Sequence, residues 1–111
     1  MGAETPNQYG VILVTAASQT EAEAIAQSLV TNHLAACVSL MPIQSVYTWQ
    51  SKVCQEQEWQ LVIKTNLELF PKLEAHIRSI HSYEVPEIIA LPILMGSKPY
   101  LQWISEQTAG D

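Results

Sequence analysis

Residues 36–65, ACVSLMPIQSVYTWQSKVCQEQEWQLVIKT, contain the most informative pattern for the fold class. Its residue pattern predicts a strand over about Ala36–Met41, a continuation over Ile43–Trp49 and a third apolar strand over Trp59–Thr65. The mostly polar Lys52–Gln57 is predicted to be turn-like. Together these segments form a long two-armed β-ribbon, more than a small domain needs for its own sheet. Open ribbon edges are normally paired with something, which favours contact with another copy of the chain.

The segments on either side of the ribbon predict two long helices and two further strands. They are a buried strand at Tyr9–Ala16, a helix opened by the capping box Ser18–Glu21, a helix carrying Phe70, Leu73, Ile77 and Ile80, a strand at Ile88–Leu94, and a short terminal helix after Ser97. This order predicts an α+β fold, the ferredoxin-like βαββαβ arrangement with an antiparallel sheet and a C-terminal helix. Both long helices then cover one sheet face and leave the other bare.

Composition predicts one domain over residues 1–111, with flexible ends at 1–8 and 109–111. Only 14% of the residues are charged, against about 25% in an average protein, and 48% are hydrophobic. A small domain has a large surface for its volume, so this shortage of charge favours a homo-oligomer.

The charge pattern excludes several partners. The net charge is −6 and the five cations are scattered, so we expect no nucleic acid. The longest apolar stretch, Ile88–Met95, is too short to cross a membrane. The amino terminus has no secretory signal pattern, so we expect a cytoplasmic protein. In that reducing compartment Cys37 and Cys54 are expected to stay free thiols.

Candidate chemistry concentrates in the loop from His81 to Glu87. His81 with Glu84 or Glu87 is a reasonable ligand set for a divalent transition metal. The alternative is structural, with Pro86 stiffening a connector and the polar residues satisfying backbone or interface groups. No phosphate loop or nucleophile motif is present, so we expect no enzyme.

Other single residues allow two interpretations. Trp49 could stack on a planar ligand, but its patterned strand position favours packing in a core or interface. Lys64 could bind an anion, or pair with Glu58 or with a carboxylate of a neighbouring chain.

The chain resembles the CutA divalent-cation tolerance family. The matching segments are Leu34–Ser39 (LAACVS), Ser45–Trp49 (SVYTW), Val62–Thr65 (VIKT), His81, Tyr83–Pro92 (YEVPEIIALP) and Tyr100–Ile104 (YLQWI), in the family's order. This resemblance implies a homotrimer in which the ribbons wrap neighbouring subunits. It also implies a part in the response to metal ions, with copper or another divalent cation as a candidate ligand. The alternative is a sensor similar to the PII signalling proteins, which uses the intersubunit cleft for a small molecule or a protein partner.

The resemblance also assigns site residues. In some family members copper binding is attributed to a cysteine and two histidines, and the corresponding residues here are Val14, Ile80 and His81. Only His81 is retained, so the expected metal site is His81 with Glu84 and Glu87. The implied intersubunit pocket is formed by Trp49, Glu58, Lys64 and Tyr83.

Overall fold

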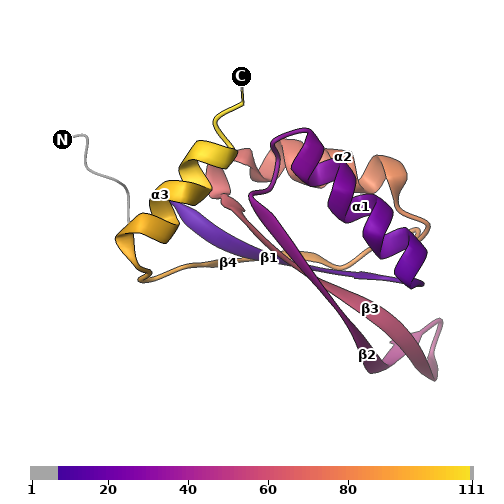
Figure 1. Cartoon of the computed structure of the whole chain (residues 1–111). Coiled ribbons are helices and arrows are strands. Elements are labelled where there is room, and N and C mark those ends of the chain that lie inside the picture. Colours follow the sequence, from indigo (N-terminus) through magenta and orange to yellow (C-terminus); the bar gives the residue numbers. More distant parts are fainter. Residues whose placement is uncertain (1–7, 111) are drawn as a thin grey trace.

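The computed structural model describes residues 8–110. In chain order its elements are β1 (Tyr9–Ala16), α1 (Gln19–Thr31), β2 (Cys37–Trp49), β3 (Lys52–Asn66), the 3-10 turn η1 (Leu67–Leu69), α2 (Phe70–Ile80), β4 (Ile88–Pro92) and α3 (Lys98–Gln107). The strands form one antiparallel sheet in the order β2-β3-β1-β4. Figure 1 shows α1 and α2 side by side over one face of this sheet. The predicted βαββαβ fold with a terminal helix is confirmed. Of the predicted flexible ends, residues 1–7 and 111 lie outside the described residues.

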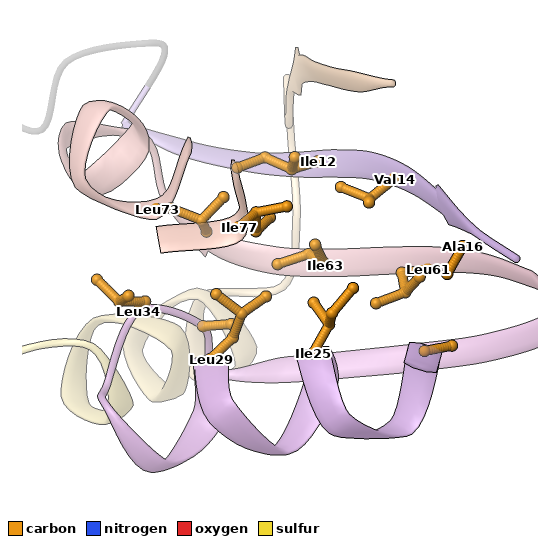
Figure 2. Close-up of a cluster of buried hydrophobic side chains, with 12 residues drawn as sticks. Ile12, Val14, Ala16, Ile25, Leu29, Leu34, Leu61, Ile63, Leu73 and Ile77 are labelled. Atoms are coloured by element: carbon orange, nitrogen blue, oxygen red, sulfur yellow. The ribbon is translucent and has the colours of Figure 1, made fainter. Parts of the chain in front are cut away.

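The core lies between that face and the two helices. Ile12 of β1 is paired with Ile63 of β3, and both side chains are fully buried. Because successive strand residues point to opposite faces, every second residue of these strands enters the core. Helix α1 contributes Ile25 and Leu29, at the helical spacing that the sequence predicted. Figure 2 shows these side chains packed against the strands.

The opposite face of the sheet is largely uncovered in the single chain. We call it the open face; its apolar members include Val11, Leu13, Val62, Ile89 and Leu91. Ile89 is 49% exposed and Leu91 is 47% exposed. Helix α3 packs at one end of the sheet, where Ile104 contacts Tyr9 and Ala36. No helix within residues 8–110 is long and apolar enough to span a membrane.

The ribbon is longer than the sequence predicted. β2 and β3 stay paired as far as Trp49 opposite Lys52, so the predicted turn over Lys52–Gln57 is wrong and this segment is strand. Its polar residues gave no alternating apolar signal because the hairpin extends beyond the core (Figure 1). The loop is only Gln50 and Ser51, with positive φ angles of 53° and 67°. Two-residue hairpin turns need such angles, which glycine and asparagine adopt most easily.

Ser51→Gly is expected to stabilise the protein. An L-residue in the left-handed region is strained, and glycine removes that strain while adding some entropy to the unfolded chain. The net gain in the free energy of unfolding should be about 0.5–1 kcal/mol, measured by urea denaturation at fixed protein concentration. Ser45→Gly, inside β2, is the matched control and should lower stability. Equal effects of the two substitutions would contradict the turn assignment.

Candidate functional site

A cleft of about 670 Å³ lies between the ribbon and the loop that joins α2 to β4. We call it the acidic cleft because four glutamates line it. Its lining residues are Thr15, Ser45, Val46, Tyr47, Trp49, Glu56, Glu58, Tyr83, Glu84, Val85 and Glu87. It is continuous with the open face, since Thr15 lies two residues beyond Leu13 on β1 and its side chain therefore points to the same side of the sheet.

The ribbon wall is built by strand register. Ser45 lies opposite Glu56, and Ile43 lies opposite Glu58. These positions and Tyr47 share one face because side chains alternate along each strand. The Tyr47 hydroxyl donates a 2.6 Å hydrogen bond to Oε1 of Glu56. This hydrogen bond to a carboxylate is the main reason that the pKa of Tyr47 rises to about 12.

The loop wall is tied to the ribbon through Tyr83. Its hydroxyl donates a 2.6 Å hydrogen bond to Oε2 of Glu58, whose residue is only 7% exposed. Burial, together with this hydrogen bond, raises the pKa of Tyr83 well above its ordinary value. Burial and the nearby charge of Glu58 likewise raise the pKa of Glu87. The cleft therefore keeps Tyr83 as a hydrogen-bond donor and disfavours negative charge on Glu87.

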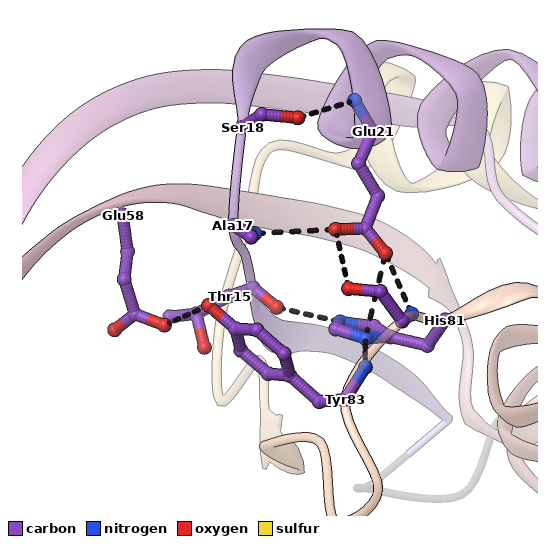
Figure 3. Close-up of polar contacts among 8 residues, drawn as sticks. Thr15, Ala17, Ser18, Glu21, Glu58, His81 and Tyr83 are labelled. Atoms are coloured by element: carbon purple, nitrogen blue, oxygen red, sulfur yellow. Dashed lines mark hydrogen bonds and ion pairs between the residues drawn. The ribbon is translucent and has the colours of Figure 1, made fainter.

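His81 lies behind the cleft wall, with a fully buried side chain. Its Nε2 lies 2.7 Å from the Thr15 carbonyl oxygen, and its Nδ1 accepts a 2.9 Å hydrogen bond from the Tyr83 N–H. These partners define the neutral tautomer with the proton on Nε2, which donates to Thr15. The contact of Nε2 thus anchors the loop to β1, while the contact of Nδ1 holds the loop's own backbone, as Figure 3 shows. Ligation of a metal by His81 would require the loss of at least one of these bonds.

Glu21 provides a second anchor for the same loop. Its carboxylate accepts hydrogen bonds from the Ser82 N–H at 2.7 Å, the Ser82 hydroxyl at 2.9 Å and the Ala17 N–H at 3.2 Å. The predicted cap is confirmed, since Ser18 Oγ accepts from the Glu21 N–H at 3.1 Å. The link from Glu21 to Ser82 was missed, because a capping box indicates only contacts within its own turn. Figure 3 shows both sets of contacts.

The structure divides the predicted site residues into three groups. The acidic cleft brings together Trp49, Glu58, Tyr83, Glu84 and Glu87. His81 is adjacent but faces inward. Lys64 lies elsewhere on the open face of the same chain, paired with Val11 and Cys37.

Within residues 8–110, no three His, Cys, Asp or Glu side chains are placed to hold one metal ion. The metal site of His81, Glu84 and Glu87 therefore stays a prediction.

A ferredoxin-like fold whose overlong ribbon forms one wall of an acidic cleft defines a narrow class of protein. The family model described as CutA1 divalent ion tolerance protein matches residues 10–107. The chain therefore belongs to the CutA1 family.

Relatives and solved structures agree with this membership. The chain is 46% identical over 99 residues to a divalent-cation tolerance protein CutA from Thermus thermophilus, covering 88% of this chain and 96% of that one. It is 42% identical over 104 residues to the Homo sapiens protein CutA, covering 93% of this chain but only 58% of the human one. The structure of the periplasmic divalent cation tolerance protein CutA from Archaeoglobus fulgidus superposes with a TM-score of 0.89 at 39% identity, covering 90% of this chain and 98% of that one.

Glu21→Gln is expected to weaken the fold in a pH-dependent way. Burial raises the pKa of Glu21, but the hydrogen bonds from Ser82 and Ala17 outweigh it and hold the pKa below its ordinary value of 4.5. Stability from this carboxylate is present above pH 4.5 and is lost as pH falls through the lower folded pKa. We expect a loss of about 1–2 kcal/mol at pH 7, measured by urea denaturation, and a smaller difference in acid.

The matched control is Glu23→Gln on the same helix, whose carboxylate accepts only an exposed hydrogen bond from Gln19. Its stability should stay within about 0.5 kcal/mol of the unchanged protein. A Glu21→Gln effect that is the same at every pH, or no larger than the control, would refute the anchoring role.

Proposed function

We propose that this protein acts in divalent-cation tolerance, and that the acidic cleft is the place where the cation acts. The observation that carries the proposal is the set of glutamates gathered there, among which Glu58 is nearly buried. Carboxylate oxygens are acceptable ligands for many divalent cations. The names of the Thermus and Archaeoglobus relatives point to the same role.

The working unit that we propose is a homotrimer. Its support is the open face, where Ile89 and Leu91 are about half exposed in the single chain, together with the ribbon that extends beyond the sheet. Covering these surfaces with other copies would bury apolar area, which favours association. In such an assembly a Lys64 from one subunit would complete the intersubunit pocket of Trp49, Glu58 and Tyr83 in another.

The predicted metal ligands enter this proposal in two ways. Glu84 and Glu87 already line the cleft and are accessible ligands. His81 becomes a ligand only if the loop releases its ring from Thr15 or Tyr83. A site made chiefly of carboxylates binds Cu(II) with modest affinity, because the thiolate and the second imidazole of the full copper set are absent.

The remaining sequence-based expectations are part of the same proposal. We expect one domain, no catalysis and a cytoplasmic location. Cys37 and Cys54 are free. Cys54 pairs with Tyr47, ten positions along β2 from Cys37, so the two cysteines lie roughly 33 Å apart and cannot form a bond within one chain. Relatives named as chloroplastic and periplasmic show that the compartment varies among similar proteins.

A second candidate function is favoured by the size of the cleft. A space of about 670 Å³ falls within the range of small-molecule sites, roughly 300–1,000 Å³. This observation supports a sensor that binds a small molecule in the intersubunit cleft, with an indirect effect on metal tolerance.

The trimer predicts a mass of about 37 kDa by light scattering, three times the 12.3 kDa of one chain. Leu91→Arg, on the open face, should shift the mass toward that of one chain, because a charge would be buried between subunits. Val30→Arg is the matched control, since Val30 is similarly exposed, at 43%, but lies on α1. A mass near 12 kDa for the unchanged protein would refute the trimer.

The cation site predicts that Glu84→Gln/Glu87→Gln lowers Cu(II) affinity at least tenfold in calorimetric titrations, through the loss of two charged ligands. Glu106→Gln, at an exposed position on α3, makes the same type of charge change and should leave the affinity unaltered. His81→Ala separates the two roles of the ring. A drop in affinity at unchanged melting temperature assigns the ring to the ion, whereas a lower melting temperature at unchanged affinity assigns it to the loop.

A further inference from the structure

A groove of about 460 Å³ lies between the end of α1 and the first turns of α2. We call it the helix groove; its lining residues are Asn32, Leu34, Lys72, Ala75 and His76. Both helices lie on the sheet face opposite the open face (Figure 1). An assembly formed through the open face can therefore form without covering the helix groove.

The helix groove carries positive charge although the protein is acidic. The net charge of the chain is −6, yet the lining residues include Lys72 and His76 and, among residues 8–110, no carboxylate. Lys72 and His76 lie four residues apart on α2, so they are neighbours on one helix face. The ion pairs found within the same described range do not include Lys72. Its ammonium group is therefore available to an anion in the groove.

Ser28 of α1 fixes the orientation of the His76 ring. Its Oγ lies 2.6 Å from His76 Nε2. Ser28 Oγ has no other hydrogen-bond partner in the part of the chain that the structure describes, which favours its hydroxyl as the donor to a neutral ring, so that the ring proton is on Nδ1. In a protonated ring Ser28 accepts from Nε2 instead, and Nδ1 again carries a proton. His76 therefore presents an Nδ1–H donor to the groove in both charge states.

Asn32 adds a third donor. One N–H of its Nδ2 donates to the Ser28 carbonyl oxygen at 2.7 Å, and the amide nitrogen carries a second N–H. Competing acceptors at the end of α1 are already occupied, since the carbonyl oxygens of Ser28 and Leu29 accept N–H groups of the turn that follows the helix. The groove thus presents hydrogen-bond donors beside the apolar side chains of Leu34 and Ala75.

We propose that the helix groove binds a small phosphate-bearing organic anion, whose phosphate oxygens accept hydrogen bonds from Lys72, His76 and Asn32. Lysine binds phosphate as a point charge. Three donors on three side chains match the three terminal oxygens of a phosphate monoester better than the two oxygens of a carboxylate. Leu34 and Ala75 contact the apolar part of the ligand.

This inference goes beyond the proposed role in cation tolerance. The helix groove lies on the helix side of the sheet, whereas the acidic cleft is continuous with the open face. The two sites share no lining residue, so each can be tested without changing the other.

The test titrates phenyl phosphate into the full chain in its native assembly, with ionic strength held constant by potassium chloride. Calorimetry measures the affinity, and the NMR signals of the His76 ring report where the anion binds. Benzoate offers two acceptor oxygens in place of three, and benzyl alcohol carries no charge.

We expect phenyl phosphate to bind with a dissociation constant of about 1 mM or lower. Its affinity should exceed that of benzoate and of benzyl alcohol by about tenfold or more, because each lacks a charged or hydrogen-bonded contact. Absence of saturable binding up to about 10 mM, or equal affinity for the three probes, would overturn the proposal.

Lys72→Gln and His76→Gln assign the donors. A glutamine at position 76 can still reach Ser28 through its terminal amide, but it has no counterpart of the Nδ1–H group. Each substitution should weaken phenyl phosphate binding about tenfold. Lys98→Gln makes the same charge change at an exposed position on α3 and should leave the affinity unaltered.

Melting temperatures establish that the variants are folded. Lys72 is exposed, so Lys72→Gln decides the matter even if His76→Gln is not folded. An unchanged affinity in Lys72→Gln, or an equal loss in Lys98→Gln, would refute the site. Cu(II) binding without phenyl phosphate binding refutes this inference alone, and the reverse result supports this inference and refutes only the cation site.

Discussion

The site depends first on the register between β2 and β3. A two-residue turn at Gln50 and Ser51 sets Trp49 opposite Lys52, and every later pair follows from it. Side chains alternate along a strand, so a slip of one residue would move Glu56 and Glu58 to the other side of the ribbon. The strained angles at the turn therefore matter well beyond the turn. They keep two of the cleft's four glutamates on the face that the loop wall closes.

The fold could be predicted well wherever packing against the core requires apolar residues at a regular spacing. Ile25 and Leu29 on α1, and Leu73 and Ile77 on α2, are buried at the spacing that the sequence showed. The prediction failed at Lys52–Gln57, where the ribbon leaves the core. A strand with no core beneath it has no reason to alternate apolar and polar residues, so its pairing is visible only in three dimensions.

The residues that line the cleft could largely be predicted from the sequence, but the hydrogen bonds that hold its loop in place could not. The loop from His81 to Glu87 was recognised because reactive side chains are dense there, and Glu84 and Glu87 do line the cleft. What holds the loop was hidden, because Glu21 lies 61 residues from Ser82 in sequence. The role of His81 was hidden for a related reason. A histidine whose ring nitrogens meet a distant carbonyl and a local N–H looks the same in sequence as a free ligand.

The acidic residues are unevenly distributed over the protein, and this distribution links the low surface charge to the acidic cleft. Of eleven acidic residues, four line one cleft, so the rest of the surface carries even less charge than the composition suggests. Apolar surface with little charge tends to associate, whereas clustered carboxylates repel one another and favour a cation. The anchors at Glu21 and His81 hold the loop glutamates against this repulsion. A cation that enters the cleft therefore meets carboxylates already in place, and less of the binding energy is spent on ordering the loop.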